Sequence, residues 1–435
     1  MNPSDISPIQ HNLQIAFSEN QINKLAGVIG FLTRHRKILP YHLVMSLLTA
    51  LGKDSNAETL QDLHRKFNEM TDLNVSRHAW REQVIKPEFV TLLIWIFKRV
   101  LVKMTKKALS FAPDSPFARF EHIWLHDGSS QAVVDGLAEI LPGRFKTVSP
   151  SAIEMHATMD LLNDNLVQLD LTEDTHSERD CLPALQHDLS STLMLKDAGY
   201  FDLGNFMAVT DREGSFVCQA PQSINPVVRK AIRFDGKHCH RFEQQKLKNI
   251  VSHFPKDGFM DLDVEWPQQA RGWTFRLVVA WNGKKKKWIF IVTNLCRGSF
   301  SMDDVFKVYR LRWQVELFFK EIKSYACWHR FNTGCATLVV SLILASFTVV
   351  VLKRSLAHAA EEGMSREIST RKVLMSGTHL FGDLMLALLK QSRHRIRRTL
   401  KKLLEFWQEN GQREHPARDR SSGRSALGLM VVGCA

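Results

Sequence analysis

The chain has 435 residues, 44% of them hydrophobic, and its 58 Lys and Arg against 45 Asp and Glu give a net charge of +13. This composition excludes a disordered chain, and the basic excess favours polyanionic partners such as nucleic acid. The N-terminal sequence lacks a charged start followed by an apolar core, which argues against a secretory signal. Seven cysteines without a CxxC pair argue against a disulfide framework and favour the reducing cytosol.

The first part of the chain predicts helices. From about residue 12 to 107, segments such as YHLVMSLLTAL, ETLQDLHRKFNEM and TLLIWIFKRVLVKM space apolar residues by three and four. Ser76 is placed to cap the short helix in NVSRHAWREQV. We predict an all-helical N-terminal domain over residues 1–118, and the basic charge of the protein favours binding of DNA ends by this domain.

Short strands follow over residues 119–219. HIWLHDGSS, AIEMHATMDLL, NLVQLDLTE and STLMLKD are apolar or alternating runs bounded by polar turns. FDLGNFMAVTDREG then predicts a helix and SFVCQ another strand. Strands followed by a helix and a further strand indicate a mixed α/β sheet.

Residues 220–294 predict a β-rich insertion. Prolines and mixed charge mark its beginning, and the strands TFRLVVAWN and KWIFIVTN flank a hairpin-like turn, NGKKKK. One helix from Met302 to about Ser324 is predicted in the next segment, 295–334.

Helices return over residues 335–412. The apolar run from Thr337 to Leu352 is shorter than the roughly 18 to 20 residues that span a bilayer, so we predict a buried helix. A basic helix, HRIRRTLKKLLEFW, follows it. Residues 413–435 have no periodicity and are predicted to be disordered.

Two aspartates each close a predicted strand and precede small residues. Asp127 follows IWLH and Asp197 follows LMLK, at places where small residues would let a ligand approach. Either aspartate alone could instead cap a helix or turn. Asp211 and Glu213, in TDREG, compete with Asp197, but they follow a helix, and we prefer Asp197.

A third acid, Glu316, lies in the basic stretch YRLRWQVELFFKEIKS. On a helical wheel, Tyr309, Arg312, Glu316 and Lys323 fall within roughly 60° beside an apolar stripe. Considered alone, this face of the helix could simply be exposed to solvent, with Glu316 and Lys320 forming an ion pair one turn apart. Three acids in a basic protein suit Mg²⁺ better, since two such ions about 3.5 to 4 Å apart support phosphodiester chemistry while basic neighbours bind phosphates.

The four residues Tyr309, Arg312, Glu316 and Lys323 have the spacing Y-x2-R-x3-E-x6-K. This spacing resembles the signature of bacterial cut-and-paste insertion-sequence transposases of the DDE class. The aspartates of HDGSS and KDAGYF resemble the first and second aspartates of that family. The resemblance covers about residues 119–350.

The resemblance implies an RNase H-like catalytic core interrupted by the β-insertion. Asp127, Asp197 and Glu316 would bind two Mg²⁺ ions, with Mn²⁺ as a substitute. Enzymes of this family act as homodimers on double-stranded DNA: water nicks one strand at the element end, the freed 3′ hydroxyl forms a hairpin, and the excised end joins target DNA. We therefore expect a bacterial cytoplasmic enzyme at the nucleoid, with no membrane partner and no small-molecule cofactor.

The resemblance also implies residues that bind DNA. Tyr309, Arg312 and Lys323 would contact phosphates, with Lys320 beside them. Hairpin formation in such relatives flips a base onto an aromatic side chain. Trp288 best matches the position of the tryptophan that the family has in its insertion domain. Three other tryptophans are weaker candidates: Trp266, Trp273 and Trp281.

Other features leave alternatives open. Relatives often have an arginine where this chain has Gln219, which suggests a missing DNA contact. The lysine run 284–287 and the segment 393–402 are further candidate phosphate contacts. The function could also be that of a nuclease without strand transfer, or of a decayed copy that only binds DNA.

Overall fold

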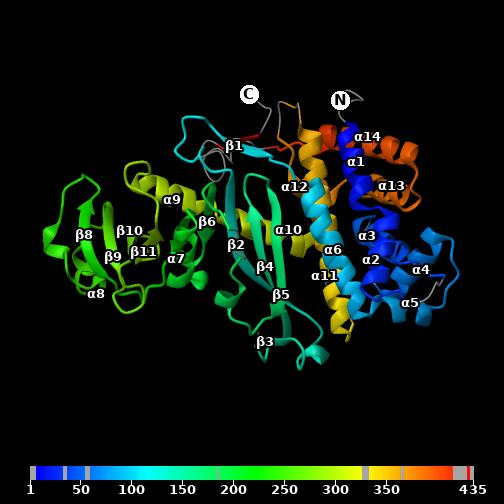
Figure 1. Ribbon diagram of the computed structural model, residues 1–435, viewed down its shortest axis with the longest axis horizontal. Coiled ribbons are helices and arrows are strands. Elements are labelled where there is room, and N and C mark those ends of the chain that lie inside the picture. Colours follow the sequence, from blue (N-terminus) through cyan, green and yellow to red (C-terminus); the bar gives the residue numbers. More distant parts are fainter. Residues whose placement is uncertain are drawn as a thin grey trace.

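The structure is a computed structural model that describes residues 6–32, 37–53, 59–183, 185, 187–325, 333–362, 364, 367–414 and 429–431. Figure 1 shows a helical body at one end, a central sheet beside it, and a smaller group of strands at the other end. The predicted α/β class with helices at both ends is confirmed.

The helical body combines both ends of the chain. The N-terminal helices are α1 (Ser7–Ala16), α2 (Glu19–Val28), α3 (Pro40–Lys53), α4 (Leu60–Thr71), α5 (Arg77–Val84) and α6 (Pro87–Met104). The C-terminal ones are α11 (Ala336–Glu361), α12 (Thr370–Met375), α13 (Thr378–Leu389) and α14 (Arg393–Asn410). Helix α6 packs on α11 and α3 packs on α13, so the two predicted helical segments share one core. As predicted, Ser76 caps α5 by accepting from the Ala79 amide.

Helix α11 passes the length and composition test for a membrane span, but 83% of its most apolar window is buried inside the protein. This agrees with the predicted buried helix. Its apolar surface is covered by α3, α6, α12 and α14.

The central sheet has RNase H-like topology. Its five strands lie in the order β5-β4-β2-β6-β7. Strands β2, β6 and β7 are parallel, whereas β4 is antiparallel to both β2 and β5. The strand bounds are β2 (His122–Ala132), β4 (Ser149–Asp160), β5 (Asn165–Glu173), β6 (Thr192–Lys196) and β7 (Ser215–Gln219). The short strand β3 (Pro142–Phe145) lies on the connection from β2 to β4 and pairs with β4.

The next four strands extend the same sheet. They form an antiparallel meander of β8 (Val227–Arg233), β9 (Phe259–Glu265), β10 (Thr274–Asn282) and β11 (Lys287–Thr293). Strand β11 pairs with β7 and so joins the meander to the central strands. The short helix α8 (Leu247–Ile250) lies between β8 and β9.

Two apolar cores cover the two faces of the sheet. On one face, Leu125, Leu195 and Val217 pack with the helices α9 (Met302–Arg310) and α10 (Trp313–Tyr325). On the other face, Phe216 stacks on Phe206 of α7 (Leu203–Asp211). Each strand therefore has one face toward α10 and the other toward α7.

Two predictions differ from the structure. The single helix predicted from Met302 to about Ser324 is divided into α9 and α10 at Leu311 and Arg312, where hydrogen bonds between residues three apart tighten the turn. Within the predicted disordered tail, Leu429–Val431 forms β12, which pairs with β1 (Leu109–Phe111). The rest of that tail, 415–428 and 432–435, lies outside the described residues.

Candidate functional site

The strand register places the two aspartates side by side. His126 of β2 pairs with Lys196 of β6, and the two strands are parallel. Asp127 directly follows His126, and Asp197 directly follows Lys196. The two aspartates therefore lie side by side at the same height along the two strands. Asp197 follows the end of β6 as predicted, but Asp127 lies within β2, which continues to Ala132.

The competing acids lie at the other end of the parallel strands. Asp211 ends α7, and Glu213 adopts a left-handed turn with φ of 60° just before β7. The Leu189 amide, ahead of β6, donates to the Arg212 carbonyl. Helix α7 therefore runs back along the sheet, and it separates these acids from Asp197.

One guanidinium contacts all three predicted acids. Arg312 Nη1 lies 2.7 Å from Asp127 Oδ2, Nη2 lies 2.5 Å from Glu316 Oε1, and Nε lies 3.9 Å from Asp197 Oδ1. Arg312 is located at the break between α9 and α10, and Glu316 lies in the first turn of α10. The structure thus brings the acids together from β2, the loop after β6, and α10.

Tyr309 continues this cluster toward β7. Its hydroxyl lies 3.0 Å from Asp197 Oδ1 and 3.0 Å from Gln219 Oε1. Because a phenol has one hydrogen, it can donate to only one of them at a time. Gln219, where the resemblance led us to expect an arginine, is therefore one of two possible acceptors for the Tyr309 hydroxyl.

Burial and charge perturb the groups of the cluster. Burial raises the pKa of Asp127 to about 6, and the nearby Asp197 and Glu316 carboxylates add to the increase, while Arg312 opposes it. The pKa of Arg312 is raised by Asp127 and by the phenol of Tyr309, against the effect of burial. Burial also raises the pKa of Tyr309.

The oxygen atoms of these three acids are suitable ligands for a divalent cation. In this structure, however, the acids are arranged as an ion-pair cluster around Arg312. Three carboxyl groups face one guanidinium, and carboxylate oxygens are the preferred ligands of Mg²⁺. Within the described ranges, no three Asp, Glu, His or Cys side chains already converge at metal-binding distance. Arg312 provides the positive charge at this place in the structure.

The two predicted lysines differ in their surroundings. Lys323 donates from Nζ to the Ser130 carbonyl at the far part of β2, and burial lowers its pKa. Lys320 is exposed on α10. Tyr309, Arg312 and Lys323, all predicted to bind phosphates, are therefore bonded to groups of the protein.

Trp288 does not face the acids. It pairs with Trp281 across the β10–β11 hairpin, and the two rings lie 5.0 Å apart in an edge-to-face arrangement. Ile291, three residues along β11, pairs with Gln219, so Trp288 and the Gln219 side chain point to opposite faces of the sheet.

Trp266, one of the three other tryptophans, lines a cavity of about 690 Å³ together with Phe201. Phe201 follows Asp197 closely in the loop before α7. Trp266 itself is 8% exposed.

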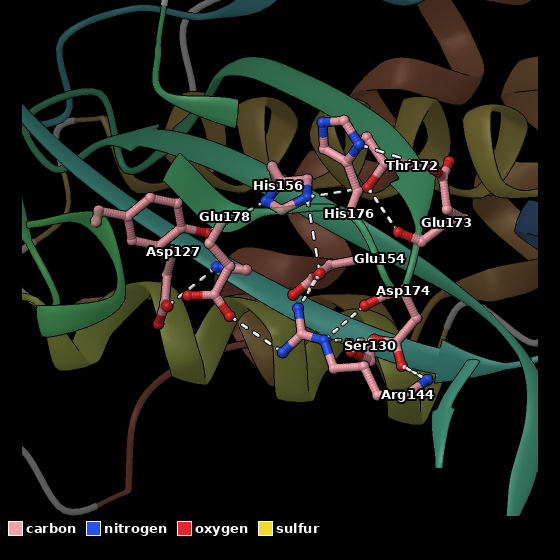
Figure 2. A network of polar contacts seen from close by, with 12 residues as sticks. Asp127, Ser130, Arg144, Glu154, His156, Thr172, Glu173, Asp174, His176 and Glu178 are labelled. Atoms are coloured by element: carbon pink, nitrogen blue, oxygen red, sulfur yellow. Dashed lines mark hydrogen bonds and ion pairs between the residues drawn. The ribbon is translucent and has the colours of Figure 1, made fainter. Parts of the chain in front are cut away.

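A second polar cluster, which we call the Arg144 network, lies beside the acids (Figure 2). Arg144 contacts Glu154, the Asp174 carboxylate and backbone, and Glu178, and the Asp174 carboxylate also accepts from the Ser130 hydroxyl. Sequence reasoning missed this network. Its residues are distant in sequence, and the one available signal was charge within β4, whose central residue Glu154 is buried.

The Arg144 network explains the small residues after the two aspartates. A Cβ at Gly128 would meet the Tyr200 hydroxyl at 2.7 Å and Glu154 at 3.0 Å, and one at Gly199 would collide with Glu178. The groups that approach these glycines are therefore side chains of the protein itself.

The chain is similar to known transposases. A family model described as "Transposase DDE domain" matches residues 146–352, a range that includes Asp197 and Glu316 and begins after Asp127. The transposase for insertion sequence element IS231B of Bacillus thuringiensis subsp. berliner is 20% identical over 460 residues, covering 94% of both chains. The transposase for insertion sequence element IS1151 of Clostridium perfringens is 20% identical over 448 residues, covering 93% of this chain and 92% of its own.

Among solved structures, a cryo-EM structure of the piggyBac transposase synaptic complex with hairpin DNA matches with a TM-score of 0.43 and 9% identity. The match covers 95% of this chain and 89% of that one.

Proposed function

We propose that the chain, which is similar to the DDE transposases of bacterial insertion sequences, is such a transposase and that Asp127, Asp197 and Glu316 are its catalytic acids. The observation that carries this proposal is the convergence of the three carboxylates on Arg312. The three acids come from β2, the loop after β6 and α10. An ordinary surface ion pair joins only two side chains and needs no such meeting of three elements.

Two Mg²⁺ ions, with Mn²⁺ as a substitute, would activate the attacking oxygen and stabilise the leaving oxygen when held by these acids. Asp127 and Glu316 would then exchange their bonds to Arg312 for bonds to metal. The released guanidinium, together with Tyr309 and Lys323, would hold phosphates next to the scissile bond. Lys320, exposed on the same helix, is placed to add a further contact.

We propose a cut-and-paste reaction on the ends of the protein's own element, with a hairpin intermediate and transfer to target DNA. The resemblance in the Y-x2-R-x3-E-x6-K spacing supports this route. It also implies a homodimer on DNA, which light scattering of the complex with DNA would measure. The reaction would take place in the bacterial cytoplasm at the nucleoid.

An aromatic side chain would hold the flipped base in this route. Trp288 matches the family position, whereas Trp266 lines a cavity near the loop of Asp197. Loss of hairpin with retained nicking in Trp288→Ala would support Trp288. The same result only in Trp266→Ala would assign the stacking to the cavity.

The test of the main proposal uses purified protein, DNA from both flanks of its gene, and Mg²⁺. The wild type is compared with Glu316→Gln and with a matched control, Glu139→Gln, whose side chain is exposed. We expect nicks, hairpins and joined products that require metal, are lost in Glu316→Gln and are kept in the control. Cleavage that survives in Glu316→Gln would reject the catalytic role of this acid.

Two other functions give different outcomes in the same assay. Metal-dependent nicks without hairpins or joining would indicate a nuclease on the same fold. Tight DNA binding without cleavage by any variant would indicate a decayed copy that only binds DNA. The three acids gathered around Arg312 favour an enzyme over the decayed copy. The similarity to transposases favours strand transfer over simple cleavage.

A further inference from the structure

Helix α14 has one apolar and one strongly basic face. Its buried residues, Ile396, Leu400, Leu403, Leu404 and Trp407, fix it to the helical body. Six exposed cations occupy the remaining surface of its first ten residues: Arg393, Arg395, Arg397, Arg398, Lys401 and Lys402. The first acid of the helix is Glu405, which pairs with Lys401.

The basic face borders a groove of about 540 Å³ between α14, α13 and α4. Arg395 and Arg398 line it on the α14 side, and Lys390 and Lys66 line it on the α13 and α4 sides. Two acids, Glu69 and Asp383, also line it, so the cations are in excess. Lys390 is bound to Asp72 at 2.7 Å, which places that ion pair at the edge of the groove.

These arginines are not needed to hold the helix in place. The apolar face packs α14 on α13 and α11. In the described part of the chain, no salt bridge joins Arg395 or Arg398 to an acid. Cations in the first turns of a helix also oppose the positive end of its dipole. The basic face is therefore unfavourable for the free protein and would gain from an anionic partner.

We propose that the groove between α14, α13 and α4, which we call the basic groove, binds the phosphate backbone of double-stranded DNA. The span from Arg393 to Lys402 is roughly 14 Å at 1.5 Å per residue, which equals the axial rise of about four base-pair steps of a duplex at 3.4 Å per step. Contacts of this kind position a duplex without reading its sequence.

The basic groove is a second DNA contact, distinct from the acids. Helix α14 lies in the helical body, whereas Asp127 lies on β2 in the central sheet (Figure 1). A duplex that reached both would be held at the acids and, farther along its length, at the basic groove. This inference rests on the proposed function, because it requires a protein that binds DNA.

The test measures binding of a labelled duplex of unrelated sequence to the full chain in EDTA, at salt from about 50 to 200 mM. The variant Arg395→Gln/Arg398→Gln should reduce the log–log salt slope by about 1.8, since each lost phosphate contact contributes about 0.9. The control Lys237→Gln/Lys248→Gln changes the net charge equally through two exposed lysines near β8. Its slope should equal that of the wild type.

A structural role of the arginines would lower the melting temperature of the variant, whereas we expect it unchanged or slightly higher. A second duplex from the gene's flank distinguishes the source of the DNA. An equal decrease on both duplexes indicates any duplex, including a target, and a decrease on the flank alone indicates an element end. Either result supports the groove.

Four results would overturn the inference. An unchanged slope in the variant, with normal wild-type binding, rejects the groove alone. An equal decrease of the salt slope in the control would show that the effect comes from the lower net charge and not from the groove. If Arg395→Gln/Arg398→Gln lost binding to phosphatidylglycerol vesicles but kept its binding to DNA, the basic face would be a membrane contact. If the wild type binds no duplex, the proposed function fails as well.

Discussion

The guanidinium of Arg312 lies 2.7 Å from a carboxylate oxygen of Asp127, although the residues are 185 positions apart in the chain. The same guanidinium contacts Glu316 and Asp197. It therefore occupies the position from which a cation neutralises all three acids. The proposed binding of metal by these acids would therefore compete with their bonds to Arg312.

Replacement of Arg312 by alanine tests this competition. Three carboxylates would lose their shared partner, so in EDTA we expect Arg312→Ala to destabilise the protein by about 1 to 3 kcal/mol, below the 3 to 5 kcal/mol of a fully buried pair. Addition of Mg²⁺ should raise its melting temperature more than that of the wild type, because no guanidinium opposes the metal. Thermal unfolding with and without Mg²⁺ measures both effects.

The control is Arg310→Ala, since Arg310 is exposed at the end of α9. Its stability should change by no more than about 0.5 kcal/mol, and its response to Mg²⁺ should equal that of the wild type. An equal Mg²⁺ response in Arg312→Ala and wild type would contradict the competition.

The pKa of Asp127 predicts how metal binding depends on pH. Burial raises this pKa to about 6. Below that pH the carboxyl group holds a proton that a metal must displace, so metal affinity should increase as the pH rises through about 6. The stability of the metal-free protein should change in the opposite direction. Because the folded protein binds the Asp127 proton more tightly than the unfolded chain, this proton stabilises the fold fully below the unfolded pKa, and the stabilisation is lost as the pH rises through about 6.

Titration of Mn²⁺ by calorimetry at about pH 5 and about pH 8 measures this dependence, with the two values chosen to bracket the raised pKa. Asp127→Asn should bind weakly and with little difference between the two pH values. A wild-type affinity that is the same at both would show that Asp127 is not a ligand.

Local patterns predicted most elements, and contacts between distant segments account for the rest. Alternating strands and the Ser76 cap follow from neighbouring residues, and both are present. The break at Leu311 does not interrupt the apolar stripe, so periodicity could not show it. Strand β12 pairs with β1 across more than 300 residues, and no local signal marks such a pairing.

The candidate site shows the same division. The strand-end positions of Asp127 and Asp197 and the motif that contains Glu316 predicted the three acids as a set, and the structure brings them together. Spacing could not show that Arg312 bridges them. It also suggested an approaching ligand at Gly128 and Gly199, where the protein's own side chains lie.

Gln219 offers a test of gained function. The resemblance led us to expect an arginine at this position, and Gln219 Oε1 lies 3.0 Å from the Tyr309 hydroxyl, near Asp197. An arginine here would add one phosphate contact, so Gln219→Arg should steepen the salt slope of DNA binding by about 0.9. Gln245→Arg, exposed after β8, adds the same charge and should leave the slope unchanged. Equal slopes in the two variants would show that position 219 does not reach DNA.

The Arg144 network predicts a large and specific loss of stability. The side chains of Glu154 and Asp174 are 3% and 2% exposed, so Arg144→Met would leave two buried carboxylates without their guanidinium. We expect a loss of roughly 3 to 5 kcal/mol, measured by urea unfolding at neutral pH. Arg229→Met is the matched control: both arginine side chains are 38% exposed, but Glu265, the partner of Arg229, is 16% exposed. Its loss should be at most about 1 kcal/mol.

The pH dependence of the loss in Arg144→Met identifies its cause. Burial already raises the pKa of Glu154, and without Arg144 that pKa would rise further. The destabilisation should therefore be greatest at neutral pH and shrink as the pH falls and Glu154 binds a proton in the folded state. A loss that stays constant with pH would instead assign the effect to packing of the arginine side chain, and would remove the electrostatic argument for the network.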